Sequence, residues 1–303
     1  MQGFVTKSEF IRKALIKKLV NFPLLPSVSP TDSLHAAPKG YVDTLVEASS
    51  PRGYLAGLNL SNNSGDANND IDISAGFCRD STNSASITLA AALTKRSDAA
   101  WAVGTNNGGM DTGTKPNSGT LHVWIIKRSD TGVVDALFST SASSPTMPTN
   151  YDYKRRIGSV RTDSSGNIFG FVQTGDDFYF KSPSTVGLDI NVTNPGTSAV
   201  LRTLSVPAGV KVKAYLIVST NNDTSNDAVY LSDPDCTDIA ASNTASPLAH
   251  VSVYTTPNDN PQGDIAVWTN TSNQIRSRHA VSGASNDFRI QTLGWMDYRG
   301  RFD

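Results

Sequence analysis

The chain has 303 residues and a formal net charge of -1, and only 38% of its residues are hydrophobic and 17% charged. Typical globular domains contain about 45–50% apolar and about 25% charged residues, and here small hydroxyl and amide residues make up the difference. The small net charge argues against charge-driven disorder, and the acidic balance after residue 21 argues against a nucleic-acid partner, which needs a basic face. No stretch approaches the roughly 20 apolar residues of a membrane span, so we expect a soluble product made in the cytoplasm.

Residues 1–27 are predicted to form a short amphipathic helix on a Pro-rich tether. Thr6 and Glu9 have the spacing of a capping box, and Pro23 ends the helical pattern. A helix this short is marginal alone in water, so its apolar stripe needs a partner. The chain's own body and a membrane surface are two alternatives, and docking into a larger assembly or bundling with its own copies is favoured. The candidate anchoring residues are Phe10, Ile11, Ala14, Leu15 and Leu19.

Residues 28–50 are predicted to form a stalk at which three copies of the chain meet. Tyr41, Val42, Leu45 and Val46 fall at helical spacings of three and four. One short stripe of this kind cannot bury itself, whereas three copies around an axis can. An ordinary interdomain helix is the alternative.

The stretch at residues 35–44, HAAPKGYVDT, resembles the collar motif at which the stalks of trimeric bacteriophage fibre proteins begin. It departs from the commoner form of the motif in having Pro38 where Asn or Thr is usual. The resemblance implies a segment on the three-fold axis, between a particle-binding N-terminus and a β-rich head. The trimer contacts are assigned to His35, Lys39, Tyr41, Val42, Leu45 and Val46.

Residues 51–303 are predicted to form a mainly β body, a large antiparallel β-sandwich or jelly-roll. Runs with strand periodicity alternate with turn clusters, and no helical segment of useful length separates them, which excludes βαβ units. Hairpin turns are predicted at 130–132 and 164–167, and a boundary near residue 183 would divide the body in two. The predicted strands are Tyr54–Leu60, Asp70–Phe77, Ser86–Thr94, Leu121–Lys127, Val133–Ser139, Arg156–Arg161, Ile168–Gln173, Phe178–Lys181, Ala199–Ser205, Val210–Ser219, Ala228–Leu231, His250–Tyr254, Asp264–Trp268 and Phe288–Leu293.

Catalytic and metal-binding patterns are not found in the sequence, so we expect no enzyme activity, no cofactor and no metal. The acidic spacing in residues 66–72 is that of a calcium loop, but Ile71 and Phe77 stand where an EF-hand needs Gly and Glu. A hydrated turn is therefore favoured there. Asp176 and Asp177 are adjacent, would face opposite sides of a strand, and cannot form a glycosidase pair.

The histidines, cysteines and tryptophans are further candidates for metal binding, disulfide formation and sugar binding. The four histidines, at positions 35, 122, 250 and 279, lack the spacing of metal ligands. Cys78 and Cys236 are too few for a disulfide framework, and two half-buried free thiols are favoured over a disulfide, which the sequence leaves open. The tryptophans are candidate sugar platforms if exposed, although aromatic residues of β-sandwiches are usually core; they are Trp101, Trp124, Trp268 and Trp295.

The segments 292–301 and 88–104 also resemble parts of phage and prophage proteins. Together with the collar motif, they predict a homotrimeric virion structural protein: a particle-docking N-terminus, a trimeric stalk and a β-rich head. Its expected partners are its own copies and other virion proteins of the capsid, neck or tail, with a host surface glycan or protein as a further candidate. Two alternatives stay open. One is a head-decorating fibre or minor tail or neck adaptor without receptor binding, and the other is a monomeric carbohydrate-binding module or hydrolase.

Overall fold

The structure is a computed structural model that describes residues 50–222, 227–253 and 260–301. The chain divides into two units, Met1–Pro51 and Arg52–Asp303, and the fold below is that of the second. The predicted anchor over 1–27 lies outside the described residues, as does the predicted stalk over 28–50 except for its final residue. Both stay predictions.

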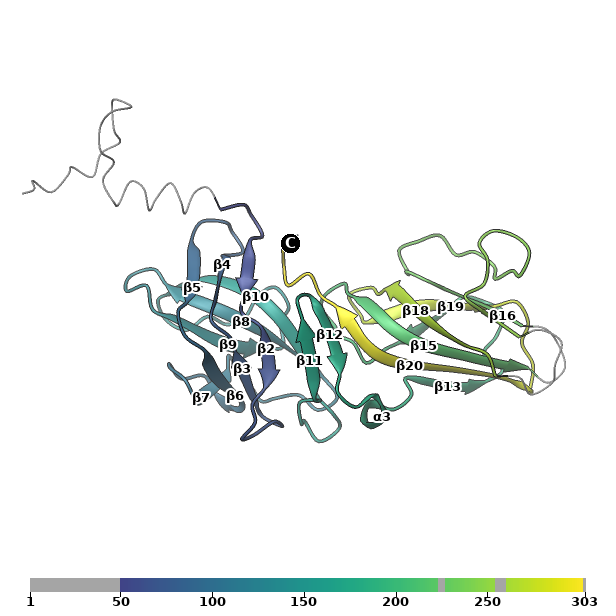
Figure 1. Cartoon of the computed structure of the whole chain (residues 1–303), viewed down its shortest axis with the longest axis horizontal. Coiled ribbons are helices and arrows are strands. Elements are labelled where there is room, and N and C mark those ends of the chain that lie inside the picture. Colours follow the sequence, from purple (N-terminus) through teal and green to yellow (C-terminus); the bar gives the residue numbers. More distant parts are fainter. Residues whose placement is uncertain (1–49, 223–226, 254–259, 302–303) are drawn as a thin grey trace, which may run out of the picture. The chain divides into compact units, whose positions relative to one another are not determined.

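Strands make up 48% of the structure, which confirms the predicted mainly β class. Among the described residues the only helix is α3, Pro183–Val186, and no helix in these ranges has the length and apolar character needed to cross a membrane. In chain order (Figure 1) the strands are β1 (Leu55–Gly57), β2 (Leu60–Asn62), β3 (Asp70–Ile73), β4 (Gly76–Arg79), β5 (Ser86–Leu89), β6 (Leu93–Ala100), β7 (Asn107–Met110), β8 (Thr120–Arg128), β9 (Val134–Ser139), β10 (Tyr151–Arg161), β11 (Phe171–Thr174), β12 (Asp177–Phe180), β13 (Ile190–Thr193), β14 (Val200–Thr203), β15 (Lys213–Asn222), β16 (Ala228–Ser232), β17 (Val251–Ser252), β18 (Gln262–Trp268), β19 (Gln274–His279) and β20 (Asn286–Met296).

The first half of the body, residues 52–168, contains a seven-stranded and a three-stranded sheet. Their strand orders are β10-β8-β9-β7-β6-β3-β2 and β1-β4-β5. Pairing is antiparallel except at β7, which runs parallel to β6 and to β9. These parallel pairs were not predicted, but no crossover helix joins them in the described chain, so the exclusion of βαβ units holds. Both predicted turns are confirmed by backbone bonds, from Arg128 N to Val133 O and from Asp163 N to Asn167 O.

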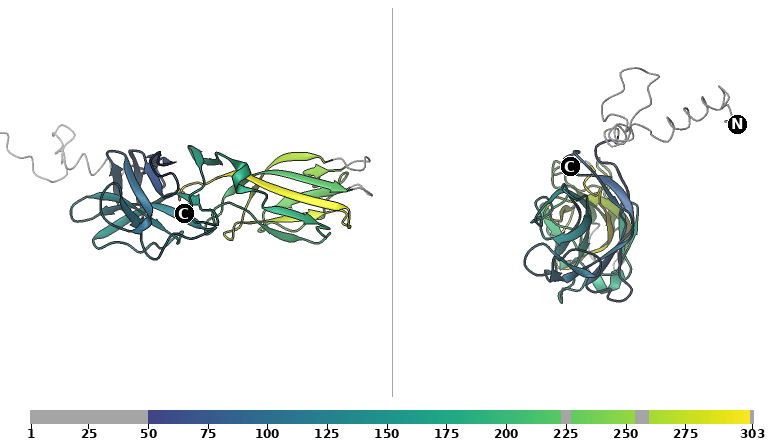
Figure 2. Two further views of the ribbon diagram at one scale, coloured as in Figure 1. Left: turned by 90° about the horizontal axis from the view of Figure 1, so that it is seen from below. Right: turned by 90° about the vertical axis from the view of Figure 1, so that its left-hand side faces the viewer.

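The second half, residues 171–296, contains a six-stranded and a four-stranded sheet. The first has the order β11-β12-β20-β15-β18 with β13 also paired to β20, and the second has the order β14-β19-β16-β17. Figure 2 shows β20, in yellow, running along this half. The ring of His279 in β19 packs edge-on against Phe288 in β20 with centroids 4.5 Å apart, so the two sheets are in contact.

One continuous hydrophobic core runs through both halves. At their junction Phe178 of β12 stacks on Trp295 of β20 with centroids 5.5 Å apart, and Phe180 meets the same indole edge-on. Two glycines permit this approach. A Cβ on Gly158 would lie 3.1 Å from the Phe178 ring, and a Cβ on Gly294 would lie 2.1 Å from the Phe178 carbonyl oxygen. The sequences on either side of residue 183 therefore share one core.

The segment 297–301 leaves β20 and packs into the first half of the body. Arg299 is only 1% exposed, and its Nε donates to the Ile157 carbonyl at 2.6 Å. Its Nη2 donates to the carbonyls of Gly57 and Leu58. Burial lowers the pKa of Arg299 to about 10, so the guanidinium is still charged at neutral pH. One buried cation therefore satisfies three carbonyls from two separate parts of the first half.

Candidate functional site

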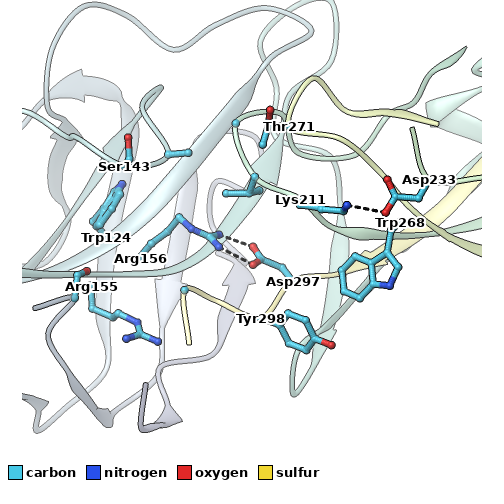
Figure 3. Close-up of a pocket in the computed structure, with 15 residues that line it drawn as sticks. Trp124, Ser143, Arg155, Arg156, Lys211, Asp233, Trp268, Thr271, Asp297 and Tyr298 are labelled. Atoms are coloured by element: carbon cyan, nitrogen blue, oxygen red, sulfur yellow. Dashed lines mark hydrogen bonds and ion pairs between the residues drawn. The ribbon is translucent and has the colours of Figure 1, made fainter. Parts of the chain in front are cut away.

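A hollow of about 750 Å³ lies where the two halves of the body meet (Figure 3). This volume falls within the range of small-molecule sites, about 300–1,000 Å³. Its aromatic lining consists of Trp124, Trp268 and Tyr298. Its charged lining consists of Arg155, Arg156, Lys211, Asp233 and Asp297.

A β-bulge in β10 sets the position of the two arginines. The pairing with β8 shifts register between Arg156 and Gly158, so Ile157 is an extra residue on the bulged strand. Bulges re-aim neighbouring side chains. Here the bulge leaves the Ile157 carbonyl to accept from Arg299, while Arg156 points toward the hollow (Figure 3). Arg155, 2% exposed, donates from Nε to the Arg299 carbonyl at 3.2 Å.

Arg156 and Asp297 form a bidentate ion pair between the two halves. The guanidinium nitrogens lie 2.6 and 2.8 Å from the two carboxylate oxygens, and the side chains are only 4% and 2% exposed. Burial acts to raise the pKa of Asp297, but the Arg156 charge and the Arg299 backbone N–H outweigh it and hold that pKa below its ordinary value. Asp297 is therefore a fixed carboxylate at neutral pH.

His122 and Ser159 form a buried pair beside this ion pair. The Ser159 hydroxyl lies 2.9 Å from His122 Nδ1 and accepts from Arg156 Nη1 at 3.2 Å. Burial, with a smaller contribution from the Arg156 charge, lowers the pKa of His122 to about 3, so the imidazole is neutral at pH 7. Ser159 is fully buried and lacks the access that a catalytic nucleophile requires. The pair is a structural contact.

The aromatic residues stand on opposite sides of the hollow (Figure 3). On one side the rings of Trp268 and Tyr298 are tilted by 35° with centroids 5.6 Å apart, and Tyr298 is 39% exposed. On the other side Trp124 is buried, donates from Nε1 to the Ser141 carbonyl at 3.3 Å, and lies under the ammonium of Lys154 at 5.5 Å. Only the first pair presents aromatic surface to solvent.

Lys211 is fixed at the rim of the hollow by two carboxylates. Its Nζ lies 2.6 Å from Asp233 and 2.6 Å from Asp235. Burial acts to lower the pKa of Lys211, but the two carboxylates outweigh it and raise that pKa above its ordinary value. An ammonium has three N–H donors, so one donor is left for another acceptor. The ion pairs therefore make this a place to bind polar groups.

The structure bears on several sequence-predicted features outside the hollow. Residues 66–69 form a turn before β3, in which Asp66 accepts two bonds from the Asn69 amide, at 2.8 and 3.1 Å, and this confirms the predicted turn. Asp176 pairs with Arg301, while Asp177 accepts from the Tyr215 hydroxyl at 2.5 Å. Within the described ranges no group of three or more His, Cys, Asp or Glu residues is placed to hold a metal.

The cysteines and tryptophans differ in burial. Cys78 is buried and Cys236 is exposed, and both are free thiols, which corrects the expectation that both would be half-buried. The reason is the fold: Cys78 lies on the core face of β4, whereas Cys236 follows β16 in a surface turn. Trp295 is core, and Trp101 is partly buried and donates to the Ala136 carbonyl at 3.0 Å. Of the four candidate sugar platforms, Trp101 and Trp268 are partly buried, and Trp268 is the one of these two that lines the hollow.

The predicted anchoring and trimer residues lie outside the described residues, so the structure brings none of them together. The anchoring set is Phe10, Ile11, Ala14, Leu15 and Leu19, and the trimer set is His35, Lys39, Tyr41, Val42, Leu45 and Val46. Sequence reasoning did not find the Arg156–Asp297 pair or the Lys211 site. The only signal in the sequence was the density of aromatic and charged residues in 295–301.

No protein-family model matches the chain, and no curated protein is detectably similar to it in sequence.

Proposed function

We propose that the chain is a bacteriophage virion structural protein, a homotrimeric fibre that docks on the particle through residues 1–27 and projects residues 51–303 as a head. The observation that carries this proposal is the collar-like stretch at 35–44, where a basic helical pattern gives way to a β-rich sequence. A fibre with such a collar is expected to be a component of the virion.

The described body supports the proposal in two ways. It is mainly β, and the contact between its six-stranded and four-stranded sheets is compatible with the predicted β-sandwich head. The carboxylates of the hollow are held by cations, Asp297 by Arg156 and Asp233 by Lys211. A binding or structural role, and not hydrolysis, is the proposal that fits these pairs.

Trimer formation is tested by measuring the mass of the full chain in solution. We expect three times the 32.3 kDa mass of one chain. Replacing Tyr41, Val42 and Leu45 together by Ser removes the proposed axial contacts, so the mass should fall to that of one chain while the β signal in circular dichroism is kept. The matched control replaces Glu47, in the same segment but outside the collar motif, by Ala.

A stable monomer of the unchanged chain would contradict the trimer proposal. So would dissociation of the control variant to the same extent as the apolar variant.

Particle docking is tested with a variant in which Phe10, Leu15 and Leu19 are replaced by Ser. We expect this protein to stay trimeric but to be missing from purified particles. Incorporation at the normal level would contradict an anchoring role for the stripe. Images of particles labelled on this chain would then separate a tail fibre from a head-decorating fibre or a neck adaptor.

A further inference from the structure

We propose that the hollow at the junction of the two halves is a carbohydrate-binding site, specific for a short neutral oligosaccharide, in which a sugar ring stacks on Trp268 and Tyr298. The inference goes beyond the proposed function because it names a site and a ligand class in the described body. It depends on residues of the β body and not on the N-terminal region.

The hollow presents an aromatic surface on which a sugar ring can stack. Trp268 and Tyr298 lie 5.6 Å apart with their rings tilted by 35°, and Tyr298 is 39% exposed at a hollow of about 750 Å³. The face of an aromatic ring carries negative charge density, and the C–H groups on one face of a pyranose are weakly positive. A sugar ring therefore stacks on such a surface through its C–H groups.

Polar groups in fixed positions lie beside the two aromatic rings. Lys211 is held by Asp233 and Asp235 at 2.6 Å each, and it keeps one ammonium donor for a hydroxyl. Asp233 is itself an acceptor at the lining of the hollow. Charged groups make stronger hydrogen bonds than neutral ones, and groups that are already ordered lose little entropy when they bind.

The ion pairs at the hollow favour a neutral sugar over an acidic one. Arg156 is neutralised by Asp297 through two bonds of 2.6 and 2.8 Å, and Lys211 by its two carboxylates. Arg155 is 2% exposed and faces the Arg299 carbonyl. The two arginines at the hollow are therefore committed to partners within the protein, and the charge of Lys211 is outweighed by its two carboxylates. A sugar hydroxyl can accept the remaining Lys211 donor, but an acidic sugar would find no exposed arginine to pair with.

The proposal is tested by applying the labelled full chain to an array of neutral and acidic oligosaccharides, then titrating each hit by calorimetry. We expect binding to neutral oligosaccharides. Tyr298→Ala should weaken it by about tenfold, since a stacked ring is lost, and Tyr298→Phe should retain it. Trp268→Ala should weaken binding similarly, with circular dichroism to confirm folding.

Tyr179→Ala is the matched control, because Tyr179 is 43% exposed and stacks on Tyr215 outside the hollow. Its affinity should equal that of the unchanged chain. The proposal is overturned if the array shows no binding, if only acidic sugars bind, or if Tyr298→Ala binds as well as Tyr179→Ala. The trimer proposal fails by a different measurement, the mass in solution, so the two failures are distinguishable.

Discussion

Replacing Asp297 by Ala would leave the Arg156 guanidinium charged in a place where the two side chains are only 4% and 2% exposed. The change removes bonds of 2.6 and 2.8 Å to Arg156 and the 2.8 Å bond that Asp297 accepts from the Arg299 backbone N–H. Breaking a buried pair from one side costs about 3–5 kcal/mol, mostly because the remaining charge is buried without its partner. That is a large fraction of a net stability of about 5–15 kcal/mol.

The assay is urea unfolding at pH 7, followed by circular dichroism. The control is Asp287→Ala, whose partner Arg289 lies 2.8 Å away with side chains about one-third exposed. There we expect a loss of only about 0.5 kcal/mol, because solvent screens the pair. The double variant Arg156→Met, Asp297→Leu should regain most of the stability, since it leaves no buried charge unpaired.

A loss for Asp297→Ala no larger than that of Asp287→Ala would refute the reasoning. So would a double variant that is less stable than Asp297→Ala, because the cost would then come from packing and not from an unpaired charge.

Three further predictions follow from burial and close contact. The folded pKa of His122, about 3, lies below the ordinary value of about 6.5, so its stabilising contribution is present above pH 6.5 and declines as the pH falls toward 3. The free energy of unfolding of His122→Gln should vary less over that range, and an equal slope would contradict this. Gly294→Ala should lower the free energy of unfolding by about 2 kcal/mol or more, whereas Gly283→Ala, with open space around its Cβ, should change it little; equal effects would contradict the contact argument. Burial raises the pKa of Cys78 to about 12, so a thiol reagent should modify one cysteine per native chain, Cys236, by mass spectrometry, and two labels would contradict the burial.

Much of the strand content could be predicted because alternation of apolar and polar residues is a local signal. Every predicted run contains part of a strand. Three strands lie outside every predicted run: β7, β13 and β19. The local signal is weak in β7, which contains Asn107-Gly108-Gly109, and in β19, which has Ile275 as its single large aliphatic residue. In β13 the apolar residues Ile190 and Val192 do alternate with polar ones, but the strand is only four residues long. Two predicted strands, 70–77 and 86–94, are each divided between the two sheets of the first half, with β3 and β6 in the seven-stranded sheet and β4 and β5 in the three-stranded sheet. Periodicity that continues along the chain does not reveal where the chain passes from one sheet to the other.

The hollow could not be predicted for a different reason. Arg156 and Asp297 are 141 residues apart in sequence, and their pairing depends on a bulge and on the path taken after β20. Neither residue is part of a recognisable motif. The parallel pairing of β7 could not be predicted either, because the side chains of a strand with two glycines specify its register only weakly.

The bonds of Arg299 have a consequence for folding during synthesis. Its guanidinium reaches the Leu58 carbonyl, 241 residues earlier in the chain. The ribosome adds about 5–20 residues each second, so Arg299 is synthesised on the order of ten seconds or more after Leu58. Until then the carbonyls of Ile157, Gly57 and Leu58 lack this donor, and chains that end before residue 299 would not form these bonds. The first half of the body therefore gains its last buried hydrogen bonds only after the ribosome has synthesised residue 299.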